Sequence, residues 1–507
     1  MKNASLTIPI HGVVSGHTDE ATISRRRILQ KSILGFGAIA LAELFRADGL
    51  AGAESVASLR PHSRATTRSV IFVFQGGGPS QVDTFDPKPL LQQLHGKDVP
   101  ESIGKTIPKI ARSPLNNLLA SPWKFRQYGE SGIPVSALHP ELGRCVDEMC
   151  VIRSCQHDSP IHAPAEFIAT TGTQVGDRPS LGAWLTYGLG SESSNLPGFV
   201  VFKTGETVRP PAIGTGFLPA QYQGVLVDSQ KGIPNLALPD GFTRSDRESQ
   251  LRLLDTLNRE HLRKSRVTSR ATSAGQDGSS AVPLETGLST LDPYDSQLEA
   301  RIKSYELAYR MQISAPAIFD LQQESAETQA LYGIDQKETS EYGRIMLLTR
   351  RLVERGVRFI QIRSGGWDSH ADIEAEHSKK CHAIDKPLAG LLIDLKRRGL
   401  FDETLVICGG EFGRTPASQR GPSKPGRDHS PSGYTTWLAG GGVRGGQVIG
   451  ATDEVGYSAI ERPVHPNDLH ATILHALGLD QHKLYFEHRN RRELVTVNGG
   501  KVIHEVF

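Results

Sequence analysis

The amino-acid sequence predicts an α/β protein, with a doubly wound and mostly parallel sheet that carries a helical insert. Three short apolar runs, at 68–74, 359–362 and 405–408, are rich in β-branched and aromatic residues, as buried parallel strands are. Glycines and polar residues follow each run, as expected where a strand leads into a ligand-binding loop. A helical pattern over 381–398, with Gly399 as its stop, joins the second and third runs into a right-handed β-α-β unit.

Length, charge and cysteine count limit the number of domains and argue against several classes of protein. The chain of 507 residues is long enough for one large domain or two to three smaller ones. Its 57 lysines and arginines against 55 acids leave no basic excess of the kind that binds nucleic acid. The five cysteines are an odd number without a C-x-x-C spacing, which argues against a disulfide scaffold and against a zinc ribbon.

The first 53 residues are predicted to be an export signal that is not part of the fold. Residues 24–30, SRRRILQ, resemble the twin-arginine motif, and the apolar stretch 33–45 is too short for a stable membrane span. Ala51-Gly52-Ala53 fits a small-x-small cleavage site. We therefore expect the mature chain, 54–507, in the periplasm or outside the cell. The alternative is a basic helix start before a core helix.

Two stretches in the first half of the mature chain present polar groups after predicted strands. The glycine-rich loop 75–89 carries Asp83 and matches neither phosphate-binding glycine motif, so nucleotide binding is not expected. The stretch 153–166, RSCQHDSPIHAPAE, is dense in side chains that take part in catalysis, and its alternative is a polar surface loop. Its candidate residues are Ser154, Ser159 and His162.

The middle of the chain differs in composition from the rest. Residues 243–345 show polar, charged helical patterns and are predicted to form a helical insert on one side of the main domain. Within it, 265–290 is rich in Ser, Thr, Gly and Ala, so we expect a flexible segment that proteases cut first. The main fold then resumes with a helix over 342–355 that Gly356 ends.

Acidic and imidazole side chains follow the second and third predicted strands in the same way. They are Asp368 and His370 after the second strand, Glu411 after the third, and Asp428 and His429 on the next loop. Because the β-α-β unit brings both strand ends to one sheet edge, these side chains can converge on a divalent metal. The alternative assigns Glu411 to a helix cap and Asp428-His429 to a turn.

Several longer motifs occur in a fixed order along the mature chain. They are GGxSxxDTFDPKP, RPSLGAWLTYGLG, GWDSH, TLVICGGEFGRTP, GRDHSPSG and DLHATILHALGLD, within Val70 to about Val502. Together they resemble a bacterial domain-of-unknown-function family numbered 1501, which is placed in the alkaline phosphatase/sulfatase superfamily. The resemblance implies a sheet of that superfamily's type and one or two divalent metals that help to cleave phosphate or sulfate esters.

The resemblance also implies roles for individual residues. Asp368 and His370 resemble the Asp/His pair of one metal, and His429 resembles a late histidine ligand. Asp83 or Gln81 stands in for a metal-binding aspartate after the first strand.

The sequence departs from the superfamily pattern at two places. Glu411 and Phe412 occupy the positions of an Asp-His pair, so one imidazole of a second metal is missing. The stretch 153–166, where the nucleophile is expected, lacks the C/S-x-P-x-R motif of sulfatases. By analogy with phosphatases, Ser154 or Ser159 is the candidate nucleophile, with His162 assisting.

These observations predict a secreted, metal-dependent hydrolase of sulfate or phosphate esters, with Zn, Mn or Ca as the metal. The expected partner is an anionic small-molecule or polysaccharide ester. Arg414 either holds an ester oxygen bidentately or pairs with an acid to fix its loop. His465 and His470, near the C-terminal helix, either have a structural role or one that supports the site, or they bind metal directly. The alternative function is a non-catalytic binding protein that keeps the fold.

Overall fold

The computed structural model describes residues 61–105, 107, 116–205, 208–232, 317–419, 423–497 and 499–507, with isolated residues between 243 and 311. The predicted signal peptide, 1–53, and the predicted flexible segment, 265–290, lie outside the described residues, as does most of the predicted insert 243–345. No helix among the described residues is long and apolar enough to cross a membrane.

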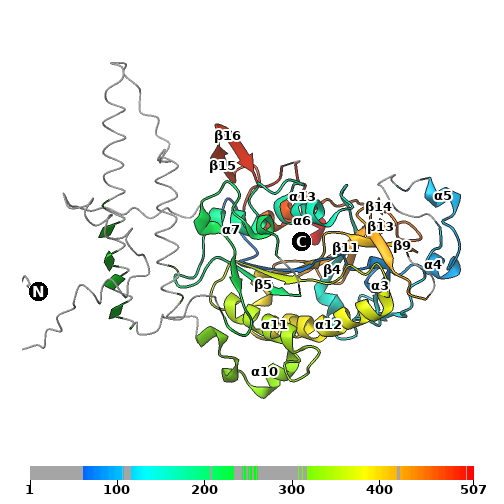
Figure 1. Ribbon diagram of the computed structural model, residues 1–507, viewed down its shortest axis with the longest axis horizontal. Helices are drawn as coiled ribbons and strands as arrows, with labels where there is room; N and C mark the ends of the chain where they lie inside the picture. The colour runs from blue at the N-terminus through cyan, green and yellow to red at the C-terminus, as the bar shows by residue number, and fades with distance from the viewer. Residues whose placement is uncertain are drawn as a thin grey trace, which may run out of the picture. The chain divides into compact units, whose positions relative to one another are not determined.

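An eight-stranded, mostly parallel sheet forms the centre of the fold (Figure 1). Its order is β12-β4-β11-β8-β1-β7-β5-β6, and β11 alone among these strands runs antiparallel to its neighbours. Strand β1 (Ser69–Gln75) lies between β7 (Phe359–Ser364) and β8 (Thr404–Gly409), which confirms the three predicted strands to within a few residues. The others are β4 (Met149–Cys155), β5 (Phe199–Thr204), β6 (Val225–Val227), β11 (Tyr434–Ala439) and β12 (Gln447–Ile449).

Helices cover both faces of the sheet, as in a doubly wound fold (Figure 1). Helices α11 (Ser340–Val353) and α12 (Ile373–Arg397) share a core with Ile71 and Val73 of β1. Val70 belongs to the opposite core, with helices α7 (Leu181–Leu189) and α13 (Pro466–Ala476). Because successive strand residues point to opposite faces, one strand supplies both cores. Helix α6 (His162–Thr171) packs beside α13.

Helix α12 begins at Ile373 and not at Cys381, where the sequence pattern placed its start. The extra turns carry Glu374 and Glu376, whose charges favour a helix N-terminus, and His377, which is buried against the loop after β1. The predicted stop holds, because Gly399 adopts a left-handed conformation with φ of 69°.

Smaller elements surround the sheet, and three of them approach its carboxyl edge. They are helix α3 (Gln81–Thr84) and the hairpin of β9 (Gly413–Ser418) and β10 (Arg427–Ser430). The remaining elements are α4 (Pro89–Gln93), α5 (Glu101–Gly104), β2 (Phe125–Tyr128), β3 (Ile133–Ser136), α10 (Ala326–Leu331), β13 (Ala451–Thr452), β14 (Ala459–Glu461), β15 (Tyr485–His488) and β16 (Arg491–Leu494).

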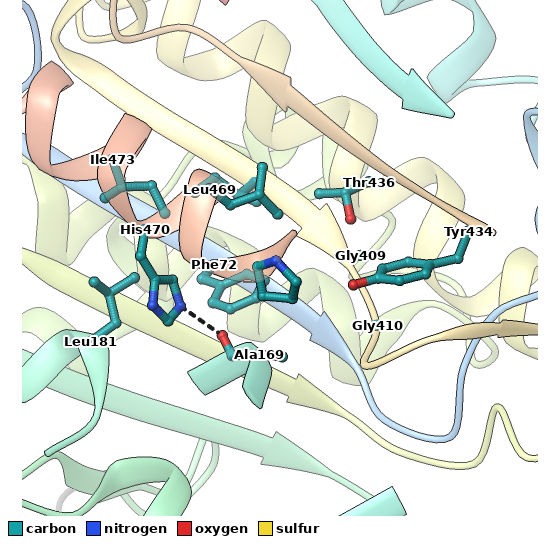
Figure 2. Close-up of a pocket in the computed structure, with 12 residues that line it drawn as sticks. Phe72, Ala169, Leu181, Gly409, Gly410, Tyr434, Thr436, Leu469, His470 and Ile473 are labelled. Carbon is teal, nitrogen blue, oxygen red and sulfur yellow. Dashed lines mark hydrogen bonds between the residues drawn. The ribbon is translucent and has the colours of Figure 1, made fainter. Parts of the chain in front are cut away.

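A cavity of about 20 Å³ lies between the sheet and helix α13, large enough for one water molecule (Figure 2). Phe72 and Ile407 line it from the sheet, and Ile473 lines it from the helix. His470 also faces it, and its Nε2 donates a 2.9 Å hydrogen bond to the carbonyl of Ala169. His470 therefore links α13 to α6 within the core.

Candidate metal centre

The loops that leave β1, β7 and β8 meet at the carboxyl edge of the sheet. A Cβ atom on Gly77, whose φ is 112°, would lie 2.5 Å from the backbone nitrogen of Asp368. Only glycine therefore lets the first loop lie against the second. Gly78 is packed in the same way against Phe412, which follows β8. The three loops form one contiguous surface, to which α6 and β10 each add a histidine.

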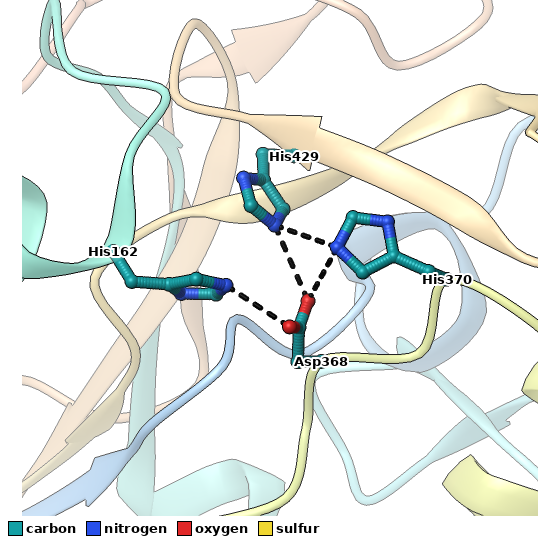
Figure 3. A group of neighbouring side chains, drawn as sticks. All are labelled: His162, Asp368, His370 and His429. Atoms are coloured by element: carbon teal, nitrogen blue, oxygen red, sulfur yellow. Dashed lines mark hydrogen bonds and ion pairs between the residues drawn. The ribbon is translucent and has the colours of Figure 1, made fainter.

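Four side chains converge at this edge with the chemistry of a metal site (Figure 3). They are His162 at the start of α6, Asp368 and His370 after β7, and His429 on β10, and their donor atoms lie within 4.8 Å of one another. Asp368 lies at the centre, with its oxygens 2.8 Å from Nε2 of His370, 3.2 Å from that of His429 and 3.1 Å from that of His162. Ligand atoms around a tetrahedral zinc ion are about 3.3 Å apart, so this spacing suits one ion.

Each of the three imidazole rings is held at its other nitrogen, Nδ1, by an oxygen acceptor. Nδ1 of His162 is 2.8 Å from Glu411 Oε1, that of His429 is 2.7 Å from the carbonyl of Pro160, and that of His370 contacts Gln419 Oε1. An acceptor at Nδ1 keeps the proton there, and the lone pair of Nε2 then points inward. In this tautomer the three Nε2 atoms and Asp368 can serve together as ligands of one cation.

The contact between two of the rings tests this fit. Nε2 of His370 lies 2.9 Å from Nε2 of His429. With both protons held on Nδ1, neither Nε2 can donate to the other, so the pair needs either an added proton or a shared cation. Three nitrogens and one carboxylate oxygen are the donors that Zn and Mn accept, whereas Ca prefers more oxygens.

The electrostatics of the centre agree with this need. Burial favours a higher pKa for Asp368, but hydrogen bonds from His162 and His429 and the charge of Arg414 hold that pKa well below its usual range. Burial favours a lower pKa for His162, but its bonds to Asp368 and Glu411 raise that pKa to about 9. Asp368 and Glu411 thus favour a positive charge at His162, which either an added proton or a divalent ion in its place can supply.

Glu411 supports a histidine, and the structure does not place it among the four converging residues. Its side chain is buried, and its Oε1 accepts from both Nδ1 of His162 and the backbone nitrogen of Gly77, at 2.8 and 2.9 Å. Asp428 also lies outside the four. Its Oδ1 accepts from the backbone nitrogen of His429 and lies 3.8 Å from Nδ1 of His370. The two acids thus contact the outer sides of the rings.

Asp83, which the resemblance offered as a metal ligand, is already paired with an arginine. Both of its oxygens accept from the guanidinium of Arg427, at 2.7 and 3.0 Å, and Ser80 donates a third hydrogen bond. Burial would raise the pKa of Asp83, but the charge of Arg427 outweighs it and lowers that pKa. The structure therefore does not bring Asp83 to the four residues, because a fully buried arginine needs its charge.

Arg414 fixes the loops, and each of its three guanidinium nitrogens already donates to an acceptor in them. Its side chain is fully buried, and it contacts the carbonyls of Gly77, Gly78 and Arg427. Nη2 also lies 2.6 Å from Asp368 Oδ1. Of the two roles left open by the sequence, this geometry is that of the arginine paired with an acid.

The hydroxyl groups of both candidate serines bond away from the four converging residues. Ser154 is buried, and its hydroxyl donates to the carbonyl of Arg462 at 2.6 Å. Ser159 Oγ lies 3.4 Å from the carbonyl of Ile161. Both hydroxyls are thus engaged with backbone carbonyls, and the structure does not identify either as a nucleophile.

Some residues of the centre carried no usable signal in the sequence. The ring of Phe412 is buried and stacks on the ring of His429, with 4.5 Å between the ring centroids. Its centroid also lies 5.0 Å from that of the His162 ring. It forms an apolar wall beside two of the rings. Gln419 and Pro160 were missed because their role depends on an amide and a carbonyl that tertiary folding aims at histidines.

Comparisons with solved structures return proteins of low sequence identity. The alkaline phosphatase from the Antarctic bacterium TAB5 is 10% identical, with 82% of this chain and 99% of that chain covered and a TM-score of 0.34. The PsFucS1 sulfatase from Pseudoalteromonas sp. is 12% identical, with 82% and 68% covered and a TM-score of 0.33. The phosphonate monoester hydrolase SpPMH from Silicibacter pomeroyi is 12% identical, with 72% and 71% covered and a TM-score of 0.29.

Comparison by sequence gives a family without an assigned activity. No curated protein matches the chain. The family model described as "Protein of unknown function (DUF1501)" matches residues 67–286 and 284–507. These matches cover nearly all of the chain outside the predicted signal peptide, and the chain belongs to this family.

Proposed function

We propose that the protein is a metal-dependent hydrolase of sulfate or phosphate esters. The observation that carries the proposal is the set of three imidazoles, each fixed at Nδ1, whose Nε2 atoms surround Asp368. A divalent ion held there would polarise an ester oxygen and make water or a hydroxyl group more nucleophilic. His162, Asp368, His370 and His429 would hold the ion, with Zn or Mn favoured over Ca by the donor set.

The centre is open to a substrate from solvent. The side chain of Asp368 is 42% exposed, and those of His370 and His162 are 29% and 25% exposed. An ester group on an anionic small molecule or on a polysaccharide could therefore reach the four residues without an enclosed pocket. Around them, Glu411 and Arg414 keep the donors in place, because each is buried and bonded to more than one loop.

The proposed location is the periplasm or the exterior of the cell, after twin-arginine export. The support is the SRRRILQ segment at 24–30 and the short apolar stretch after it. Export of a folded protein suits a metal centre whose donors come from distant parts of the chain. Such donors meet only after folding, so the metal would be loaded before transport.

Elemental analysis combined with a panel of aryl sulfate and phosphate esters tests the proposal. Purified wild-type protein should hold about one divalent ion per chain and hydrolyse at least one class of ester. His370→Ala should lose both metal and turnover, because alanine offers no ligand. The control is His475→Ala, which removes an exposed histidine of α13 that is not among the four residues. Wild-type protein without metal after growth in replete medium would refute the proposal.

A non-catalytic binding protein is the second candidate. It is favoured by the hydroxyl groups of Ser154 and Ser159, which are engaged with backbone carbonyls. The same experiment separates the two candidates. A binding protein would hold the metal and lose it in His370→Ala, yet it would show no turnover on any ester of the panel.

A further inference from the structure

Two buried arginines adjoin the metal centre, and each has its own acid. Arg414 pairs with Asp368, and Arg427 pairs with Asp83. Both guanidinium groups are fully buried, and so is Asp83, whereas Asp368 is partly exposed at the centre itself. Taking a charge out of water is costly unless an opposite charge lies beside it, so neither arginine can lose its acid without rearrangement.

Arg427 is joined to the centre through its backbone as well as its side chain. Its backbone nitrogen donates to the carbonyl of Ser369, at 3.1 Å, and Ser369 lies between Asp368 and His370. Its carbonyl accepts from Nη1 of Arg414 at 3.2 Å. Along the chain it is followed by Asp428 and His429. The position of Arg427 therefore influences both the loop after β7 and the strand that carries His429.

The side chain of Arg427 is held by a pair of hydrogen bonds to Asp83, here called the fork, which fixes the direction of the guanidinium group. Nε and Nη2 donate to the two oxygens of Asp83, and Nη1 donates to the carbonyl of Thr415 at 3.3 Å. Asp83 is in turn anchored by Ser80, whose backbone nitrogen donates to Nε2 of His377. Two parallel hydrogen bonds from a guanidinium to a carboxylate set orientation as well as charge.

We propose that Asp83 is a positioning residue of the metal centre, which orients His429 and the loop after β7 by holding Arg427. It also leaves Asp368 available to the metal. Without Asp83, the unpaired guanidinium of Arg427 would seek another carboxylate, and Asp368 already lies beside the neighbouring Arg414. The inference rests on the metal centre proposed above but not on hydrolysis.

Metal affinity of the purified full chain tests the role of Asp83, with zinc and manganese titrated against a chelator of known affinity. Asp83→Asn should weaken binding about 10- to 100-fold, the usual effect of losing a residue that supports a ligand. A second variant, Asp83→Asn with Arg427→Gln, removes the unpaired cation. It should fold more stably than Asp83→Asn and still bind metal about 10- to 100-fold more weakly than wild type, because the fork is gone.

The matched control is Asp394→Asn in helix α12. Asp394 is a buried carboxylate held by Arg350 and Arg398, at 3.0 and 2.9 Å, and it is not among the residues of the centre. Its loss should lower the melting temperature as that of Asp83 does, but it should leave metal affinity within about twofold of wild type.

Each result of this comparison decides the matter. Weakened metal binding in both Asp83 variants, with binding retained in Asp394→Asn, supports the proposal. Wild-type affinity in a folded Asp83 variant overturns it, as does equal weakening in Asp394→Asn. If neither Asp83 variant folds while Asp394→Asn does, Asp83 serves the fold and the proposal is also overturned. If wild-type protein binds no metal, both the proposed function and the role of Asp83 are overturned. That result is obtained before any variant is made and is thus distinguishable from the others.

Discussion

Replacing His470 by glutamine should remove part of the acid sensitivity of the fold. His470 is buried in helix α13, and its Nε2 donates to the carbonyl of Ala169, while Nδ1 has no hydrogen-bond partner among the described residues. Burial in this apolar surrounding lowers the pKa of His470 to about 4. Glutamine can still donate to Ala169, but it cannot be protonated.

The magnitude follows from the two pKa values. In the folded protein His470 stays neutral down to about pH 4, whereas in the unfolded chain it takes up a proton near pH 6.5. The unfolded state therefore binds more protons between these values, and stability falls as the pH falls from 6.5 towards 4. The loss is about 1.8 kcal/mol between pH 7 and pH 5, and about 3 kcal/mol once the pH is well below 4.

Urea unfolding at several pH values from 7 to 4.5 measures this loss. The protein should be kept in chelator, because metal release is itself linked to proton uptake. Between pH 7 and pH 5 the unfolding free energy of the wild type should fall by about 1.8 kcal/mol more than that of His470→Gln. His475→Gln, on the exposed side of the same helix, is the control and should keep the wild-type pH dependence. Parallel pH curves for wild type and His470→Gln would refute the argument from burial.

Three further perturbations address the centre and the export signal. Glu411→Gln should weaken metal binding about 10- to 100-fold in chelator competition, because the carboxylate that holds a ligand histidine is lost. Gly77→Ala should lower the melting temperature more than Gly96→Ala does, since both have positive φ but a Cβ meets backbone within 3 Å only at Gly77. Replacing Arg25 and Arg26 by lysine should leave the precursor in the cytoplasm, as fractionation would reveal, and periplasmic protein in that variant would contradict the signal.

The fold could be predicted because its central strands are continuous apolar runs. Strands β1, β7 and β8 are buried along most of their length. A strand buried on both faces is apolar at nearly every position, and its sequence alone therefore identifies it. The start of α12 was missed because the residues from 373 to 380 are mostly polar, and their helical state depends on His377 packing under the loop after β1. Contacts between residues far apart in the sequence cannot be predicted from the residue pattern of either segment alone.

The candidate metal centre could be predicted only in part, and for the same reason. Asp368, His370 and His429 stand out as acid and imidazole at strand ends and on the adjoining loop, and the structure brings them together. His162 was expected to assist a nucleophile, because the sequence does not show that the start of α6 lies against the loop after β8. The ion pair of Arg427 with Asp83 could not be predicted from the residues around either of them.

Three carboxylates at this edge illustrate what decides such roles. Asp368, Glu411 and Asp428 all follow the sequence rule that an acid at a strand end or on the adjoining loop points to a ligand site. Glu411 is committed to a histidine and a backbone nitrogen, and Asp428 to the backbone of His429, while Asp368 alone faces three Nε2 atoms. A carboxylate that already satisfies ring and backbone donors orients a ligand, whereas one that faces three imidazole Nε2 atoms can share a cation with them. The assignment therefore depends on which donors the folded chain places beside each acid, and these donors come from sequence-distant loops.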